Sequence, residues 1–120
     1  MDKKIRMVLM LDFYGQLLTE RQDEILQMYY NHDLSLGEIA QNLGITRQGV
    51  YDNIKRSEKV LYNMEEKLGL VSRFMEQKLK ITKALELVGE IEEEIKDCDL
   101  EVAYNKVKTV KNILIEVADH

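Results

Sequence analysis

The stretch SLGEIAQNLGITRQGVYDNI, residues 35–54, contains two short helical patterns separated by a glycine. Ser35 is followed three residues later by Glu38, a pair that forms a capping box at the start of a helix. This pattern predicts a short helix over residues 36–43. Gly44 comes where the chain must leave that helix, a position that favours the left-handed conformation. The stretch therefore predicts two helices joined by a tight turn.

The residues around the glycine have the offsets of a helix-turn-helix, in which two helices meet at a steep angle. Ala40 is the small residue at the point of approach, and Leu43 and Ile45 flank the turn. Val50 and Ile54 face back toward the corner from the second helix. The alternative is an ordinary pair of helices joined by a glycine C-cap, but that arrangement does not require Ala40 or Val50 at these offsets. We therefore predict a helix-turn-helix.

Two helices are predicted before this corner. Residues 2–18 predict an amphipathic first helix, because apolar residues recur at offsets of three and four. Thr19 and Gln22 form another capping box, which predicts a second helix from about residue 20 to 31. The predicted apolar face of the first helix is Ile5, Val8, Leu9, Asp12, Phe13 and Leu17, and that of the second is Ile25, Leu26, Met28 and Tyr29.

The helix after the turn is longer than a compact corner needs. Thr46 is its predicted N-cap, and the helical pattern continues to about Leu68 and stops at Gly69. Positions along it follow the alternating spacings of four and three that are typical of a coiled-coil seam, which we expect to pair with a partner helix. The seam is Val50, Ile54, Ser57, Leu61, Met64 and Leu68.

The rest of the chain predicts two further helices, over residues 72–96 and 100–118. Asp99 is a predicted N-cap between them, and the short connection makes the pair an antiparallel hairpin. Their apolar stripes are Phe74, Ile81, Leu85, Val88, Ile91 and Ile95 in the first helix and Ala103, Val107, Val110, Leu114 and Val117 in the second. Because the small N-terminal module cannot cover all these stripes, we predict a homo-oligomer built by the hairpin and the helix after Leu61.

The predicted fold class is all-α, in agreement with the absence of proline from a chain of 120 residues. We divide it into a helix-turn-helix module with a long fourth helix, residues 1–70, and a C-terminal helical hairpin, residues 71–120, as the predicted oligomerisation region. The net charge is −5. Residues 1–70 carry 9 basic and 11 acidic side chains, and residues 71–120 carry 8 and 11. Since proteins that coat phosphate backbones are usually basic, any nucleic-acid contact must come from a local patch.

The second corner helix and its cap supply eight candidates for contact with nucleic acid. Arg47 and Gln48 lie at the end that meets base edges, where Arg suits guanine and Gln suits adenine. Asp52 would accept a hydrogen bond from a cytosine amino group but would repel phosphates. Glu58 lowers the positive charge of the basic patch. A solvated helix face is the alternative interpretation. The eight candidates are Thr46, Arg47, Gln48, Tyr51, Asp52, Lys55, Arg56 and Lys59, of which the last three would contact phosphates.

The run LLTERQDEILQMYYNHDLSLGEIAQNLGITRQGVYDNIKRSEKVL, residues 17–61, resembles region 4 of bacterial sigma factors and the related tails of response regulators. The shared pattern is a capped LTERQ helix followed by S-x-x-E-I-A-x-x-L-G-I-T-R. With the preceding MVLMLDFYGQLLT, the whole chain is similar to the YlxM family of small Gram-positive proteins. The similarity is clear over residues 5–75 and weaker in the hairpin.

This resemblance implies a sigma region 4-like, tri-helical core of the winged-helix type, followed by a long helix and an antiparallel hairpin. Members of the family are typically encoded beside Ffh, the GTPase of the signal recognition particle. The resemblance therefore implies a DNA-binding or regulatory protein that takes part in the signal recognition particle pathway. The alternative is an accessory protein that binds the particle's GTPase or RNA and has no DNA-binding role.

No enzyme, cofactor or metal site is expected from the sequence. His32 lies in a polar loop and His120 is the last residue, so no pairing of a histidine with a nucleophile is indicated. The single cysteine, Cys98, lies between Asp97 and Asp99, whose charges disfavour a thiolate. Uncharged apolar runs are only a handful of residues long, and no signal-peptide pattern is present. We expect a cytoplasmic protein with no membrane contact.

Overall fold

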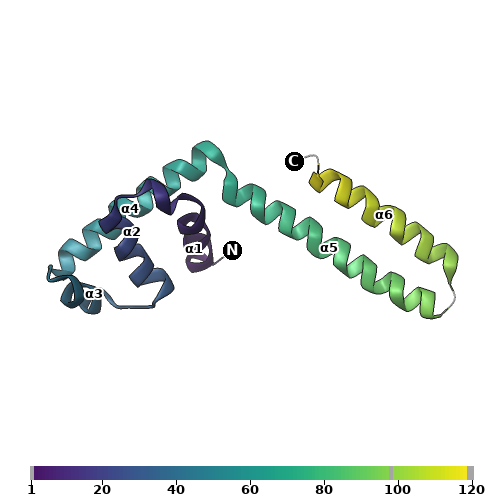
Figure 1. The fold of residues 1–120 in the computed structure, drawn as a ribbon, viewed down its shortest axis with the longest axis horizontal. Helices are drawn as coiled ribbons and strands as arrows, with labels where there is room; N and C mark the ends of the chain where they lie inside the picture. Colours follow the sequence, from purple (N-terminus) through teal and green to yellow (C-terminus); the bar gives the residue numbers. More distant parts are fainter. Residues whose placement is uncertain (1, 98, 119–120) are drawn as a thin grey trace. The chain divides into compact units, whose positions relative to one another are not determined.

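The computed structural model describes residues 2–97 and 99–118, and all secondary structure within them is helical, which confirms the all-α prediction. By contacts the chain forms two compact units, Met1–Ser72 and Arg73–His120. Cys98 and His120, considered above as reactive groups, lie outside the described residues. In chain order (Figure 1), the helices are α1 (Lys3–Tyr14), the 3₁₀ turn η1 (Gly15–Leu17), α2 (Glu20–Leu26), the π-helical turn η2 (Gln27–Asn31), α3 (Leu36–Leu43), α4 (Arg47–Leu68), α5 (Leu70–Lys96) and α6 (Leu100–Ala118).

The predicted helix starts are confirmed by their capping hydrogen bonds. The Thr19 hydroxyl accepts from the backbone N–H of Gln22 at 3.2 Å, and the Gln22 side chain accepts from the Thr19 N–H at 3.1 Å. Ser35 and Glu38 make the same reciprocal pair, both at 3.1 Å. These bonds satisfy backbone donors that have no partner within the helix. They place the starts of α2 and α3 where the sequence predicted them.

Gly44 leaves α3 with φ 68° and ψ 35°, the left-handed conformation that the sequence predicted. We expect Gly44→Val to lower the free energy of unfolding by about 1–2 kcal/mol, because a β-branched residue is strained at positive φ. Gly44→Asn is the control and should cost less, since asparagine tolerates this conformation. Urea unfolding of the three proteins measures the difference. Equal stability of the valine variant and the parent would contradict the turn geometry.

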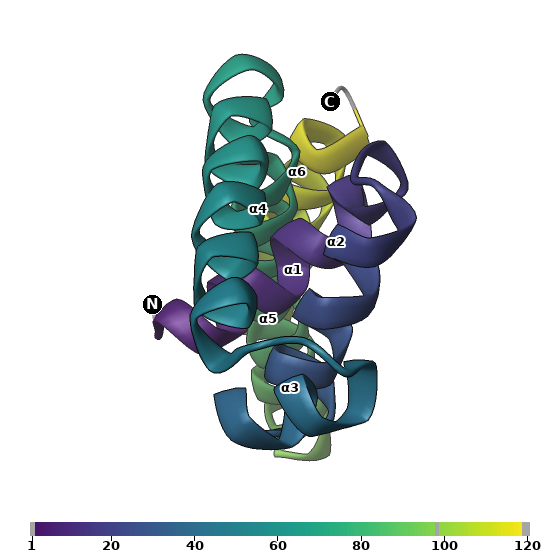
Figure 2. The ribbon, with the colours of Figure 1, turned by 90° about the vertical axis from the view of Figure 1, so that its left-hand side faces the viewer.

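The core of the first unit lies between α4 and the three helices that precede it. Figure 2 shows α4 running beside α1 and α2, with α3 near its beginning. Val50, Ile54, Ser57 and Leu61 of the predicted seam are all buried there. Over these four positions the seam therefore pairs with helices of the same chain. Only its last residue, Leu68, is well exposed.

The buried face of α1 differs from the predicted one. Ile5 and Leu17 are 53% and 59% exposed, and Phe13 is also exposed. The residues that enter the core are Met7, Met10, Leu11, Tyr14 and, after the helix, Leu18. Both sets have spacings of three and four, so periodicity alone does not choose between them. The helix also ends at Tyr14, before the predicted boundary, because η1 and the extended Leu18 lead into the cap of α2.

The predicted second helix is interrupted by the wider turn η2. The backbone N–H of His32 donates to the carbonyl of Gln27 at 3.1 Å, a step of five residues instead of four. The extra residue rotates the end of the helix, so Tyr30 is buried while Met28 and Tyr29 are only half-buried. The predicted apolar face is therefore correct for Ile25 and Leu26. After Leu26 the buried face is rotated away from the predicted one.

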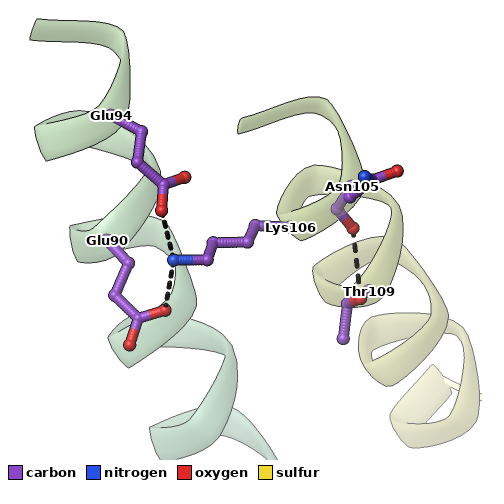
Figure 3. A network of polar contacts seen from close by, with 5 residues as sticks. All are labelled: Glu90, Glu94, Asn105, Lys106 and Thr109. Carbon is purple, nitrogen blue, oxygen red and sulfur yellow. Dashed lines mark hydrogen bonds and ion pairs between the residues drawn. The ribbon is translucent and has the colours of Figure 1, made fainter. Parts of the chain in front are cut away.

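The second unit is an antiparallel pair formed by α6 and the part of α5 from Arg73 onward (Figure 1). The Asp99 carboxylate accepts from the backbone N–H of Val102 at 3.4 Å, which confirms the predicted N-cap. Between the helices (Figure 3), the Lys106 ammonium lies 3.0 Å from Glu90 and also donates to Glu94. These bonds raise the pKa of Lys106. They link the helices across the hairpin.

The stripes predicted for the hairpin are only partly its inner face. Ile91 and Ala103 are buried as expected, together with Ala84 and Leu87, which the predicted stripe of α5 omitted. Val110 and Val117 are half-buried. The other members of the predicted stripes are exposed, because α5 and α6 each carry two apolar stripes and only one can face the partner helix. The exposed members are Phe74, Ile81, Leu85, Val88 and Ile95 in α5 and Val107 and Leu114 in α6.

Candidate nucleic-acid interface

The N-terminus of α4 is held open to solvent by the helix-turn-helix corner. Thr46 is extended, and its hydroxyl accepts from the backbone N–H of Gly49 at 2.9 Å, so α4 begins at Arg47 as predicted. Behind this end, Ile39 and Val50 are fully buried and fix the angle between α3 and α4. The first turns of α4 therefore have one face anchored in the core and another exposed.

All eight sequence-predicted contact residues lie at exposed positions of this segment, but they do not form one uniform row. At about 100° per residue, Gln48, Asp52, Lys55 and Lys59 share the outward face of α4. Arg47 lies to one side, where its guanidinium covers Gly37 of α3: a Cβ added to Gly37 would come within 3.1 Å of it. The eight exposed residues are Thr46, Arg47, Gln48, Tyr51, Asp52, Lys55, Arg56 and Lys59.

Two of the candidate base readers contact each other. The Gln48 side-chain amide donates to the Asp52 carboxylate at 2.9 Å. This pair is one turn apart on the exposed face, so it is a local helix-surface bond. It leaves Gln48 one amide hydrogen and its carbonyl oxygen for other partners. Asp52 thus modifies the neighbouring reader as well as adding a negative charge.

A buried carboxylate lies below the basic residues of this face. Glu58 is 6% exposed and accepts from the Tyr30 hydroxyl at 2.5 Å. The ammonium groups of Lys55 and Lys3 each lie 3.9 Å from its other oxygen, and Lys55 lies 5.4 Å from the centre of the Tyr51 ring. Burial and the hydrogen bond to Glu58 raise the pKa of Tyr30. Glu58 therefore positions two cations at this surface while offsetting part of their charge.

Sequence reasoning did not find Lys3 or Tyr30 as part of this surface. Lys3 lies in α1, more than fifty residues before Lys55, and no motif connects them. Tyr30, which donates to Glu58, lies in the wider turn η2, which the sequence pattern did not predict. A small pocket beside the cluster is lined by Lys3, Tyr29, Tyr30, Leu36, Tyr51, Ile54, Lys55 and Glu58.

The model of the family described as "Putative helix-turn-helix protein, YlxM / p13 like" matches residues 1–113. The chain belongs to this family. The match includes the helix-turn-helix corner, the exposed face of α4 and most of the hairpin.

Curated relatives agree with this assignment. A UPF0122 protein of Acetivibrio thermocellus is 60% identical over 91 residues, which are 76% of this chain and 75% of the relative. A UPF0122 protein of Desulforamulus reducens is 50% identical over 80 residues, 67% of this chain and 68% of the relative. One of Bacillus velezensis is 45% identical over 107 residues, 89% of this chain and 97% of the relative.

In residues 2–97 and 99–118, no three or more His, Cys, Asp or Glu side chains are grouped so that they would hold a metal ion. Over the same residues, no helix combines the length and the apolar character needed to cross a membrane.

Proposed function

We propose that this chain is a non-enzymatic, cytoplasmic regulatory protein that binds duplex DNA through the exposed face of α4. The observation that carries the proposal is the capped N-terminus of α4, presented by a helix-turn-helix corner with basic side chains along its exposed turns. Such a helix fits the major groove, where its first residues meet base edges. The family description supports the same class of protein. Residues 1–70 would form the binding module and residues 71–120 an assembly region.

Each exposed residue has a distinct proposed role at the DNA. Arg47 and Gln48 would read bases, with Arg47 braced against Gly37 and Gln48 oriented by Asp52. The hydroxyl of Thr46 is used by the cap, so its contribution is to define where α4 begins. Tyr51 would contact the DNA backbone beside the bases that Arg47 and Gln48 read. The contacts to phosphates would come from the basic residues Lys55, Arg56 and Lys59.

A second candidate function is favoured by the acidic groups at this surface. Asp52 is exposed among the readers, and Glu58 is shared by Lys3 and Lys55, so the face is less basic than that of most DNA-binding modules. With a net charge of −5, the chain would bind duplex DNA weakly outside specific sites. The alternative is an accessory protein in the signal recognition particle pathway that binds the particle's GTPase or RNA without binding DNA.

The test is a titration of the protein against duplex genomic fragments, the particle's RNA and its GTPase, all at one salt concentration. We expect sequence-selective binding to duplex DNA. Arg47→Ala should weaken it by about 1–3 kcal/mol and relax the selectivity. Lys55→Ala should weaken binding to all DNA sequences alike. It should also reduce the slope of the logarithm of the binding constant against the logarithm of the salt concentration by about one.

The matched control is Lys67→Ala, which removes an exposed lysine from the last turn of α4, far from the proposed contacts. It should leave DNA binding unchanged. Binding to the RNA or the GTPase by a parent protein that shows no DNA binding would overturn the DNA proposal and support the alternative. Far-ultraviolet circular dichroism of each variant confirms that it is folded.

A further inference from the structure

α5 presents a second apolar stripe to solvent in the part that belongs to the hairpin. Leu85 is 66% exposed and Ile81 is 44% exposed, and Val88 is also exposed. At about 100° per residue, this stripe lies roughly a quarter turn around the helix from Ala84, Leu87 and Ile91, which face α6. A shallow groove on the stripe is lined by Phe74, Gln77, Lys78, Ile81, Thr82 and Leu85.

The exposed apolar residues of α6 lie on the same side of the hairpin. Val107 and Leu114 lie four residues after the inner-face residues Ala103 and Val110, a rotation of about 40° around the helix in the same sense as on α5. In two antiparallel helices, rotations away from the contact in the same sense point both stripes to one side. The hairpin therefore has one apolar side that includes both helices.

The stripe on α5 is self-complementary about Leu85. Lys78 lies seven residues before Leu85 and Glu92 lies seven residues after it, so each is about two turns away on the same face. Ile81 and Gly89 lie four residues before and after it. If two copies of α5 were placed antiparallel around a two-fold axis at Leu85, Lys78 would face Glu92 of the other copy, and Ile81 would face Gly89.

Gly89 has no evident role within its own chain. A Cβ added there would meet no atom within 4 Å, and the residue is helical with ordinary φ. Glycine inside a helix is less favourable than alanine, so its presence there calls for a reason. Opposite a large side chain from another helix, however, the missing side chain permits a close approach. The space at Gly89 matches the Ile81 side chain of an antiparallel copy.

The charges along α5 also match an antiparallel copy. Residues 73–83 carry four basic and one acidic side chains, a net charge of +3, and residues 86–96 carry one basic and five acidic, a net charge of −4. A parallel second copy would align like charges, whereas an antiparallel copy aligns opposite ones. The intramolecular ion pairs of the hairpin use Lys80 and Lys106, so Lys78 remains available at the edge of the stripe.

We propose that the apolar side of the hairpin binds the same side of a second copy of this chain, with α5 antiparallel to its counterpart and the two-fold axis at Leu85. The interface is isologous, so each contact occurs twice. Leu85 packs on Leu85 of the second copy, Ile81 fills the space over Gly89, and Lys78 pairs with Glu92. This pairing is independent of what α4 binds, and its tests require no nucleic acid.

Disulfide trapping tests the position of the axis. All variants carry Cys98→Ser, so that the introduced thiol is the only one. Leu85→Cys should form a disulfide-linked dimer under mild oxidation, because residues at the axis approach within bonding distance. Lys78→Cys alone and Glu92→Cys alone should form no disulfide-linked dimer. A mixture of the two variants should form one, because Lys78 of one copy faces Glu92 of the other. Lys83→Cys, about 200° around the helix from Leu85, is the control and should remain monomeric under denaturing conditions.

Charge reversal tests the complementarity. Lys78→Glu or Glu92→Lys alone introduces two like-charge contacts and should raise the dissociation constant of the dimer by about tenfold. The double variant Lys78→Glu/Glu92→Lys should return to within about twofold of the parent, because both contacts are restored. Sedimentation equilibrium measures these constants, and circular dichroism confirms folding.

Three results would overturn the proposal. The first is a parent protein that sediments as a monomer up to about 100 µM, which would place the dissociation constant of any dimer well above that concentration. The second is self-cross-linking of Lys78→Cys or Glu92→Cys alone, which indicates a parallel pair or an axis away from Leu85, because in the proposed pair neither residue faces its own counterpart. The third is a double charge variant that stays as weak as the single ones, which shows that the two residues do not face each other.

Discussion

Glu65→Ala is expected to destabilise the N-terminal unit by about 3 kcal/mol, because it removes the acceptor of several buried donors. Glu65 is 7% exposed. Its carboxylate accepts from the Tyr14 hydroxyl at 2.7 Å and from the backbone N–H groups of Val71 and Ser72 at 3.0 Å each. The last two are at the start of α5, where backbone donors have no partner within the helix. One side chain of α4 therefore both anchors α1 and caps α5.

The matched control is Glu66→Ala, which removes the exposed neighbouring carboxylate and should change stability by less than about 0.5 kcal/mol. Glu65→Gln should have an intermediate effect, since its amide has one acceptor oxygen where the carboxylate has two. Urea unfolding monitored by circular dichroism compares the four proteins. If Glu65→Ala unfolds at the same urea concentration as Glu66→Ala, the network does not stabilise the fold.

The same network predicts a pH dependence. Burial by itself would raise the pKa of Glu65, but the hydrogen bonds from Tyr14, Val71 and Ser72 outweigh it and hold the pKa below its ordinary value. Its stabilisation is therefore complete above the unfolded-state pKa of about 4.3 and is lost as the pH falls through the lower folded-state pKa. We expect the stability difference between the parent and Glu65→Gln to shrink below about pH 4. A difference that is constant from pH 7 to pH 3 would contradict this assignment.

Leu61→Ala is expected to lower the free energy of unfolding by about 3 kcal/mol. Leu61 is fully buried in the core that α4 forms with the preceding helices, and truncation removes contacts and leaves a cavity. Because helices of the same chain cover the side chain, the loss relative to the parent should be equal at about 5 and about 100 µM protein. A loss that depends on concentration would mean that a second copy covers this position.

Leu68→Ala is the control for this experiment, since it is the same substitution seven residues later in the same predicted seam. Leu68 is 50% exposed, and its truncation should cost about 0.5 kcal/mol or less. Equal losses of unfolding free energy in Leu61→Ala and Leu68→Ala would indicate one continuous seam with a single partner. Unequal losses are expected, because the N-terminal helices cover the seam only as far as Leu61.

The sequence by itself determined the features that depend on neighbouring residues. The starts of α2, α3 and α4, the left-handed Gly44 and Gly69, and the cap of α6 by Asp99 all follow from local chemistry. A capping side chain reaches backbone donors two or three residues away, and a glycine adopts positive φ without a steric penalty. These choices need no information from the rest of the chain. The exposed positions of the eight candidate residues, on α4 and at its N-cap, follow in the same way, from the corner and the helical period.

Only the tertiary structure decided which apolar stripe of an amphipathic helix is buried. α1 carries one stripe with Ile5 and Phe13 and another with Met10 and Tyr14, and α5 carries one with Leu85 and another with Leu87. Both stripes of each helix have the same period and similar hydrophobicity, so the sequence pattern cannot rank them. In α1, the choice follows the core that the other helices provide and the bond from Tyr14 to Glu65.

The polar clusters were likewise decided by tertiary contacts. The extra residue in η2 directs Tyr30 toward Glu58, and α1 brings Lys3 to the same carboxylate, although no local pattern relates these three residues. The guanidinium of Arg47 covers Gly37 because α3 and α4 meet there at the corner. Local capping bonds form within a few residues and can be predicted from them. The face a helix buries and the partner a carboxylate finds are properties of the assembled chain, because they depend on surfaces that only the other helices supply.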